Sequence, residues 1–401
     1  MKHSNLTTYF EKYITKDSLF LNKEALQSSY LPDTLLHRDE EINQIASILA
    51  PCLKLEKPSN IFIYGKTGTG KTACIQYITS QIKSLAQSKN IPLRIFYVNC
   101  KLRKVADTEY RLMAHLSREL GKEIPPTGLP TEEIYKLFFN TIDTQKQQVI
   151  IVLDELDQIV KKTGDELLYN MTRINSELKN AQLSIIGISN DMTFTDNLDP
   201  RIKSSLSEEE ILFPPYNALQ LQNILRKRAQ VAFKRGCLVR GVIEKCAAYA
   251  ARGHGDARRA LELLRVAGEI AERGNKPAVA IKHLDEAQEK IERDKVTDII
   301  LTQPKQYHLV LYSLLQMKNK KGISTGDIYE AYTQLCSRTS QRPLTTRRIS
   351  DIIAELDMFG IVNARVVSKG RYGRTKEITL SIPPSLSANI EKSLKESLGL
   401  E

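Results

Sequence analysis

The stretch Gly65-Lys66-Thr67-Gly68-Thr69-Gly70-Lys71-Thr72 stands between an apolar run, Ile61–Tyr64, and a helical pattern that starts at Ala73. A strand, a glycine loop and a helix in this order are the context that a phosphate-binding loop requires. Glycines let backbone N–H groups turn inward around an anion, and the helix N-terminus adds partial positive charge there. Lys71 would reach the outer phosphates, and the Thr72 hydroxyl would ligate Mg²⁺. The sequence therefore predicts a nucleoside triphosphate site, and the alternative is a glycine-rich turn that matches by accident.

An unbroken apolar run, Val149–Leu153, predicts a second part of the nucleotide site. Such a run is typical of a strand that is buried on both faces of a parallel sheet. It ends in Asp154-Glu155-Leu156-Asp157, and α/β folds place their chemistry at the carboxyl ends of such strands. We expect Asp154 to hold Mg²⁺ through water and Glu155 to orient and polarise an attacking water. An acidic helix start is the simpler alternative, and the nearby phosphate-loop pattern disfavours it.

Two more polar positions follow predicted strands or turns. Asn190, at the end of a strand predicted over Leu183–Asp191, could hydrogen-bond the γ-phosphate or the lytic water, although asparagine there is more often a turn former. Arg201 follows Pro200 on a rigid turn, which suits an arginine finger acting on a neighbouring copy's nucleotide; a capping or surface arginine is the alternative. With a further strand predicted over Leu93–Cys100, the alternation of strands and helices up to residue 213 predicts a doubly wound α/β domain.

The segment before the phosphate loop predicts an amphipathic helix that opens with Arg38-Asp39-Glu40-Glu41. A segment in this place can cover the adenine ring of a bound nucleotide or dock against the domain, and the two roles are compatible. Residues 1–30 are mixed and helical at best, and no role is assigned to residues 1–25.

After Phe213-Pro214-Pro215-Tyr216 the pattern is helical only, and it predicts a small helical domain over residues 214–297. Its helices are expected near residues 217–234, 239–252, 256–273 and 282–295. Asp256 should cap the third of them. Arg258, in the first turn, could reach back to a phosphate, and a cation in that position opposes the usual helix-dipole preference, which mildly favours a functional role.

The last segment, residues 298–401, predicts three helices followed by a β-hairpin, which is a winged helix-turn-helix. The start of its third helix would lie against a major groove, and the glycine-bearing hairpin tip suits a minor groove or phosphates. A winged helix used for protein contacts is the alternative, but the basic tip favours DNA. The predicted DNA-contacting residues are Thr345, Thr346, Arg347, Arg348, Arg365, Lys369, Gly370, Arg371, Tyr372, Arg374 and Lys376.

Composition sets further bounds. At 401 residues we expect two or three domains, and 41% apolar with 26% charged residues is normal for a soluble globular protein. No apolar h-region follows the N-terminus and no run approaches the length of a membrane span, so we expect neither a signal peptide nor a membrane partner. The six cysteines form no close CxxC pair, which argues against structural zinc; Cys74 and Cys246 are expected in the core.

The net charge of +11 is uneven along the chain. Residues 1–213 carry about −1, residues 214–297 carry +7 and residues 298–401 carry +5. This distribution suggests a polyanion partner for the C-terminal half, with a solubilising surface as the alternative.

Taken together, these motifs resemble those of the archaeal Orc1/Cdc6 replication initiators, which are AAA+ ATPases, over nearly the whole chain. The strings that carry the resemblance are Gly65–Thr72, Asp154-Glu155-Leu156-Asp157, Ser189-Asn190-Asp191, Leu198–Leu206, Gly255–Leu261 and the hairpin Asn363–Arg374. The resemblance implies a P-loop AAA+ domain, a helical lid and a C-terminal winged-helix domain.

The resemblance also implies site roles. They are Walker A at Lys71 and Thr72, Walker B at Asp154 and Glu155, sensor 1 at Asn190, the arginine finger at Arg201, sensor 2 at Arg258, and nucleotide-lining positions at Tyr216 and Arg228. By the same resemblance, Asp191–Leu198 matches the initiator-specific insert, which touches DNA from the ATPase domain.

The implied function is an ATP-switched initiator that binds and distorts origin double-stranded DNA and helps load the replicative MCM helicase. ATP or ADP with Mg²⁺ would be its cofactors, other initiator copies would be partners on DNA, and its location would be cytoplasmic and nucleoid-associated. Hydrolysis would be slow and would act as a timer. An ATP-dependent transcriptional regulator of the signalling NTPase type is the main alternative, although such proteins typically lack an arginine like Arg258. A processive motor or clamp loader is a third, for which a C-terminal sequence-reading domain is an odd appendage.

Overall fold

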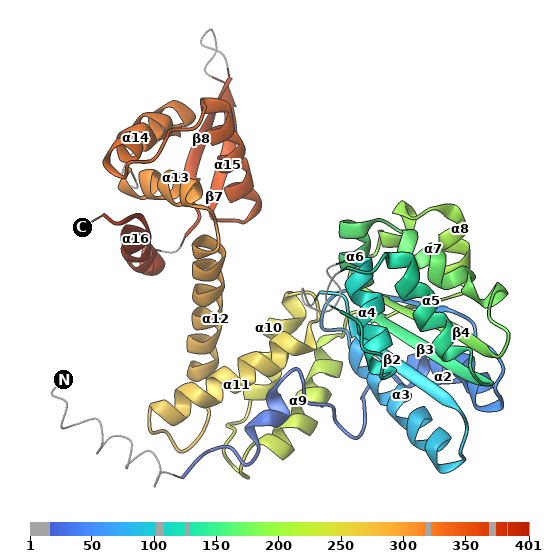
Figure 1. Cartoon of the computed structure of the whole chain (residues 1–401). Helices are drawn as coiled ribbons and strands as arrows, with labels where there is room; N and C mark the ends of the chain where they lie inside the picture. Colours follow the sequence, from blue (N-terminus) through green and yellow to red (C-terminus); the bar gives the residue numbers. More distant parts are fainter. Residues whose placement is uncertain are drawn as a thin grey trace, which may run out of the picture. The chain divides into compact units, whose positions relative to one another are not determined.

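The computed structural model describes residues 17–101, 108–125, 128–317, 322–368, 374–382 and 384–400. The chain forms two compact units, Met1–Leu284 and Asp285–Glu401 (Figure 1). Each unit has its own core of apolar side chains.

The first unit is built on a parallel sheet of five strands in the order β2-β3-β4-β1-β5. The strands are β1 Ile61–Tyr64, β2 Leu93–Asn99, β3 Gln147–Asp154, β4 Ala181–Ser189 and β5 Glu209–Leu212. Because β1 lies between β4 and β5, Tyr64 pairs with both Ser189 and Leu212. The chain that leaves β1 is therefore flanked by the chains that leave β4 and β5.

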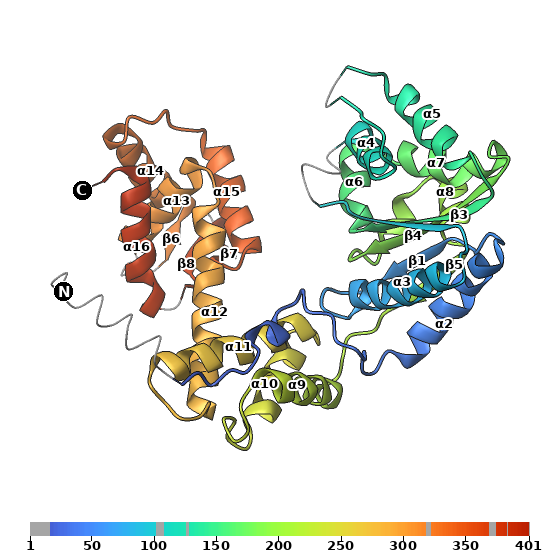
Figure 2. The same ribbon diagram turned by 60° about the horizontal axis from the view of Figure 1, so that its bottom comes forward.

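Both faces of this sheet are covered, as the apolar run in β3 predicts. Val149, Ile151 and Leu153 pack with the helices on one face, and Ile150 and Val152 pack with those on the other. Figure 2 shows the helices on both sides of the sheet. One face carries α2 Asp39–Leu49 and α3 Lys71–Ser88; the other carries α4 Glu109–Glu119, α5 Thr131–Ile142, α6 Leu156–Thr163, α7 Glu166–Arg173 and α8 Pro200–Leu206.

The helical part of the first unit follows β5 through Phe213–Tyr216, where the predicted boundary at residue 213 falls. It contains α9 Ala218–Ala232, α10 Val242–Arg252 and α11 Ala257–Arg273. The N-terminal 3₁₀ helix Lys23–Leu26 packs on α9 and α11, and just before it Phe20 lies against Phe233 with ring centroids 4.6 Å apart. Helix α12, Ile281–Leu301, is continuous through residue 297, where the sequence places a second domain boundary.

The second unit has the predicted winged helix-turn-helix order. It contains α13 Lys305–Gln316, β6 Ile323–Ser324, α14 Thr325–Arg338, α15 Thr346–Met358, β7 Val362–Ser368, β8 Arg374–Leu380 and α16 Pro384–Leu398. Its sheet is antiparallel in the order β6-β8-β7. Ser324 caps α14 through a capping box with Asp327, and Thr345 caps α15. The predicted fold class is thus confirmed, while β5, β6, α7, α8 and α16 are additions to the predicted elements, and Arg201, expected on a turn, lies in α8.

Candidate functional site

The glycine loop adopts backbone conformations that favour glycine, and the helical part of the unit approaches it closely. Gly68 has φ +71°, and a Cβ placed there would lie 1.7 Å from Asp256 Oδ1. Gly70 has φ +95°, and a Cβ there would lie 2.8 Å from the Tyr216 hydroxyl oxygen. Both positions therefore favour glycine for two reasons: the backbone is left-handed, and there is no space for a Cβ atom.

Lys71, the first residue of α3, is buried under the loop with 5% of its surface exposed. Its Nζ donates to Gly65 O at 2.7 Å, to Lys66 O at 2.8 Å and to Asn190 Oδ1 at 2.8 Å. Three acceptors satisfy the ammonium group, but burial lowers the pKa of Lys71 to about 8. The structure thus brings together the predicted phosphate-binding lysine and the predicted strand-end asparagine.

The expected Mg²⁺ ligands also lie together. Thr72 Oγ1 donates to Asp154 Oδ2 at 3.0 Å, and Asp154 is 4% exposed. A hydroxyl and a carboxylate are hard oxygen ligands, and Mg²⁺ usually takes only one or two protein ligands beside phosphates and waters. The two residues therefore fit a Mg²⁺–nucleotide complex. The described residues hold no cluster of three or more His, Cys, Asp or Glu side chains arranged for a metal, which such a site does not require.

Glu155 has a left-handed backbone, with φ 55° and ψ 44°, directly after β3. This conformation is uncommon for a residue other than glycine, and such outliers cluster at functional sites. Its carboxylate lies 3.7 Å from Lys101 Nζ, and its backbone N–H donates to Asp154 Oδ1 at 3.0 Å. Glu155 therefore leaves the sheet beside the predicted Mg²⁺ ligand, as expected for a residue that orients water.

A cavity of about 300 Å³ joins the loop to the helical part of the unit. Four parts of the chain line it: the segment around Tyr30–Leu36, the loop with α3, Tyr216 before α9, and α9 with α11. The lining includes Leu31, Pro32, Leu35, Gly68, Gly70, Thr72, Gln76, Tyr216, Arg228 and Arg258. Apolar side chains from the N-terminal segment and cations from the helices therefore share one cavity with the phosphate loop.

Arg228 is held in this lining by contacts with Tyr30. Arg228 Nη2 donates to Tyr30 O at 2.9 Å, and its guanidinium carbon lies 4.7 Å from the centre of the Tyr30 ring. Arg228 Nη1 is buried and has no hydrogen-bond partner in the described part of the chain. Burial also lowers the pKa of the Arg228 guanidinium. A half-buried cation with a buried, unused donor at a cavity wall fits an anionic ligand.

Arg258 lies in the first turn of α11, which Asp256 caps. Asp256 Oδ1 accepts from Arg258 N at 2.8 Å and from Arg259 N at 3.2 Å. The same cap contacts the loop: Ala257 N donates to Gly68 O at 3.1 Å, and Thr67 Oγ1 donates to Asp256 Oδ2 at 3.5 Å. The predicted cap at Asp256 is confirmed, and it brings Arg258 to the cavity that the loop lines.

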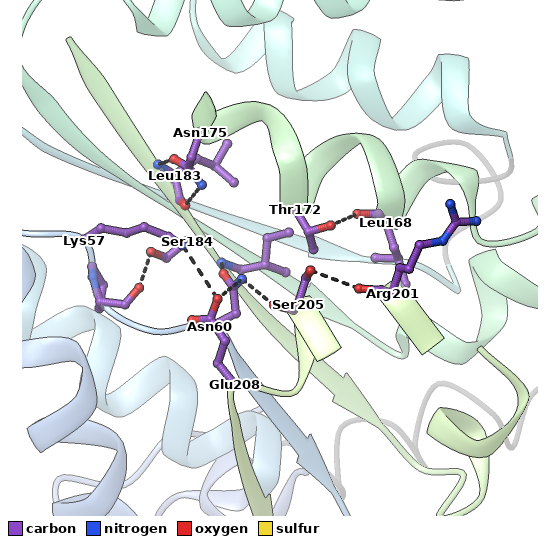
Figure 3. Close-up of polar contacts among 12 residues, drawn as sticks. Lys57, Asn60, Leu168, Thr172, Asn175, Leu183, Ser184, Arg201, Ser205 and Glu208 are labelled. Atoms are coloured by element: carbon purple, nitrogen blue, oxygen red, sulfur yellow. Dashed lines mark hydrogen bonds and ion pairs between the residues drawn. The ribbon is translucent and has the colours of Figure 1, made fainter. Parts of the chain in front are cut away.

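Arg201 stands apart from this cluster. Its Nε and Nη2 donate to the two carboxylate oxygens of Asp199, at 3.1 and 3.0 Å, and the side chain is 65% exposed. Figure 3 shows the Arg201 side chain directed away from the buried hydrogen bonds around Asn60, while Ser205 Oγ donates to Arg201 O in α8. An exposed arginine of this kind is compatible with an action on another copy, and this role stays a prediction.

In the second unit, the first turn of α15 carries the predicted DNA-contacting residues Thr346, Arg347 and Arg348, all three of them exposed. Arg348 is held within the unit, because Nη1 lies 3.3 Å from Glu355 Oε1 and Nη2 lies 3.4 Å from the Tyr307 hydroxyl. The structure therefore separates an outward Arg347 from a tethered Arg348.

The hairpin residues are only partly described. Arg365 is exposed on β7 and lies opposite Glu377, and Lys376 lies on β8. Lys369, Gly370, Arg371 and Tyr372 lie outside the described residues, and only the backbone of Arg374 is described. The predicted insert at Asp191–Leu198 includes the 3₁₀ turn Phe194–Asn197.

Comparison with known proteins identifies the family. Three family models match consecutive parts of the chain: "ATPase domain predominantly from Archaea" at residues 35–204, "Cdc6 AAA+ ATPase-type lid domain" at 222–289, and "CDC6, C terminal winged helix domain" at 298–388. ORC1-type DNA replication protein 1 of Methanosarcina mazei is 50% identical over 405 residues, which cover 100% of this chain and 96% of that protein. The ORC1-type DNA replication protein of Thermococcus onnurineus is 52% identical over 396 residues, covering 97% and 95%.

This chain belongs to the ORC1-type DNA replication proteins.

A solved structure of the Aeropyrum pernix ORC1 protein in complex with DNA has the same fold, with a TM-score of 0.82 and 44% identity over 95% of this chain and 98% of that chain. The AAA+ domain, the lid and the winged helix of this ORC1-type chain are therefore those of its family. No helix among the described residues is long and apolar enough to cross a membrane.

One residue of the ORC1-type site was missed in the sequence. Tyr97 on β2 donates its hydroxyl hydrogen to Asp154 Oδ2 at 2.5 Å, and burial together with the nearby carboxylate raises the pKa of Tyr97. A tyrosine near the end of a predicted strand carries no distinctive motif. Tyr97 reaches the Asp154 carboxylate only because β2 and β3 are adjacent strands of the sheet.

Proposed function

We propose that this chain is an ATP-switched replication initiator. It binds origin double-stranded DNA through α15, the hairpin and the insert Asp191–Leu198, distorts that DNA, and helps to recruit the replicative MCM helicase. The observation that carries the proposal is the cavity in which the phosphate loop meets Arg258 of the lid. A site made by two parts of the unit can report through their relative arrangement whether a nucleotide is bound, which suits a switch.

The roles of the residues follow from their positions. Lys71 leaves its carbonyl acceptors to bind the β- and γ-phosphates. Thr72 and Asp154 would hold Mg²⁺, which would neutralise phosphate charge. Glu155 polarises the attacking water, and Asn190, which contacts Lys71 Nζ, orients the γ-phosphate or that water. Arg258 adds a second cation from the lid.

The proposed hydrolysis is weak and is completed by a neighbouring copy. Arg201 would leave Asp199 and approach that copy's nucleotide, because an arginine supplied to a γ-phosphate stabilises the charge that develops in phosphoryl transfer. Hydrolysis then takes place after initiator copies have assembled on DNA, and the ADP-bound state ends that assembly.

DNA binding is proposed from the winged helix. Arg347 on the first turn of α15 faces solvent, where a recognition helix presents side chains to a major groove. The related Aeropyrum pernix ORC1 protein, which shares this fold, was solved in complex with DNA. The net charge of +5 over residues 298–401 adds an attraction to phosphates that depends on salt.

A footprinting experiment tests the proposal. The protein is bound to origin-repeat DNA and to promoter DNA of similar composition, each in the presence of ATP and of ADP. We expect protection of the repeat at protein concentrations that leave the promoter unprotected, and a different pattern with the two nucleotides. Equal protection of both DNAs would reject the initiator in favour of an ATP-switched transcriptional regulator or a general DNA-binding protein.

A further inference from the structure

Arg38, just before α2, is a buried cation that the proposed reaction does not use. Only 2% of its surface is exposed. Its Nε donates to Thr69 O, in the phosphate loop, at 2.9 Å. Its Nη2 donates to Pro214 O, in the connection between β5 and α9, at 2.5 Å. Arg38 therefore joins the loop of the α/β domain to the segment that leads into the lid.

The remaining contacts of Arg38 fix the plane of its guanidinium. Nη1 donates to Glu41 Oε1 at 2.8 Å and to His37 O at 3.3 Å. The guanidinium carbon lies 4.0 Å from the centre of the Tyr216 ring. A planar group with donors on three sides and an aromatic ring on its face is a geometry that arginine provides and lysine does not.

The segment that Arg38 holds touches both ends of the phosphate loop. A Cβ at Gly65 would lie 2.5 Å from Phe213 O, and a Cβ at Gly70 would lie 2.8 Å from the Tyr216 hydroxyl. Phe213–Tyr216 therefore lies against the loop without free space, and a change in its position is felt by the loop.

The same segment contacts the start of α11. A Cβ at Gly255 would lie 2.3 Å from Tyr216 O, so the backbone before α11 packs directly on Tyr216. Asp256, the next residue, caps the turn that carries Arg258. Contacts therefore run without a gap from Arg38 through Tyr216 to the helix that presents Arg258.

We propose that Arg38 is a positioning residue that fixes the hinge between the α/β domain and the lid. By holding Pro214 and Tyr216 against the loop, it sets the place at which Arg258 meets a nucleotide whose phosphates Lys71 binds. This inference rests on the nucleotide binding proposed above. Arg38 therefore affects nucleotide affinity through the position of Arg258.

A double-mutant cycle tests this assignment. The dissociation constant of a fluorescent non-hydrolysable ATP analogue is measured for the full chain, Arg38→Lys, Arg258→Ala and the double variant. Charge-assisted hydrogen bonds are lost in Arg38→Lys, so we expect about a tenfold weaker affinity. In the Arg258→Ala background the same substitution should weaken affinity by less than about threefold, because the group that Arg38 positions is absent.

The control is Arg226→Lys on α9, where the arginine pairs with Glu244 on the surface of the lid and should leave affinity within twofold of the parent chain. Thermal melting of each variant is followed in parallel, and Arg38→Gln, which keeps an amide NH₂ donor group without the charge, replaces Arg38→Lys if the lysine variant does not fold. Equal losses in the two backgrounds, or no loss at Arg38, overturn the inference. A parent chain that binds no nucleotide overturns the proposed function instead, so the two failures are distinguishable.

Discussion

The contact between the phosphate loop and the cap of α11 predicts an unusually large effect for Gly68→Ala. The substitution adds one methyl group at a residue with φ +71°, and that methyl would lie 1.7 Å from Asp256 Oδ1 and 2.2 Å from Asp256 Cγ. Asp256 cannot stay in place, since atoms do not approach to such distances. It must give up its hydrogen bonds to Arg258 N and Arg259 N, or the lid must move away from the loop.

The size of the effect follows from three parts. An alanine in the left-handed region costs about 1–2 kcal/mol. Loss of an aspartate N-cap costs about 1 kcal/mol. Loss of the bond from Ala257 N to Gly68 O costs about 1 kcal/mol. Gly68→Ala should therefore reduce the free energy of unfolding of the first unit by about 3–4 kcal/mol.

Thermal unfolding followed by calorimetry measures the effect. At about 2–4 °C for each kcal/mol, Gly68→Ala should melt roughly 6–16 °C below the parent chain, and Asp256→Ala roughly 2–4 °C below it. The matched control is Gly121→Ala, because Gly121 has φ +81° and nothing lies within 4 Å of its Cβ position. It should show the backbone cost alone, about 1–2 kcal/mol.

The double variant Gly68→Ala/Asp256→Ala decides whether the clash is the cause. With the carboxylate removed, the added methyl loses its closest contacts, so the double variant should melt no lower than Gly68→Ala alone. If the two single effects add in full, or if Gly68→Ala behaves like Gly121→Ala, then the loop and the cap are not in the contact described above.

Three further predictions concern the proposed activity. Lys71→Ala should abolish binding of a fluorescent ATP analogue and leave DNA affinity in a gel-shift titration largely intact; loss of DNA binding would mean that the two sites are more tightly coupled. Tyr97→Phe removes the hydrogen bond to Asp154, so Mg²⁺-dependent ATP hydrolysis should fall about tenfold, as for other partners of metal ligands, while nucleotide binding in EDTA stays unchanged; a loss of binding in EDTA would assign Tyr97 to folding. Arg347→Ala should reduce the slope of log affinity for DNA against log salt by about one, whereas Arg226→Ala on the lid should not, and an unchanged slope would remove Arg347 from the interface.

The elements that the sequence predicted best are those in which local pattern and tertiary environment agree. The apolar run of β3 is long enough to fill both faces of the sheet, and Ser324 and Thr345 mark helix starts by their own chemistry. β5 is different, because Glu209-Glu210 is polar and the strand is formed by pairing with β1 at the edge of the sheet. Four residues that begin with two glutamates show no apolar run or alternation of apolar and polar residues that would predict such a strand.

The candidate site divides in the same way. The loop, Asp154 and Asn190 follow predicted strands, and adjacent parallel strands bring their carboxyl ends together, so their convergence was predictable. The contacts of Arg38 and Tyr97 were not, because both depend on which strand lies beside which and on how the lid packs on the loop. Arg348 shows the limit in another way, since the carboxylate that tethers it lies seven residues further along the same helix.

The arrangement around the cavity also explains why a cation in the first turn of α11 is tolerated. Arg258 lies in the first turn of α11, at the positive end of that helix. Burial lowers the pKa of Lys71, Asp154 acts in the opposite direction, and the charge of Arg258 lowers that pKa further, so the two cations repel each other. Arg228 adds a third positive charge to the same lining. What holds the lid against the loop is therefore neutral or locally paired: the cap at Asp256, the bond from Ala257 N to Gly68 O, and the contacts of Arg38. A bound polyphosphate reverses the sign of this balance, because it turns repulsion among the three cations and the N-termini of α3 and α11 into attraction to a common anion. The affinity of the lid for the loop should then depend on how many phosphates the ligand carries, and that dependence is what would let the chain distinguish ATP from ADP.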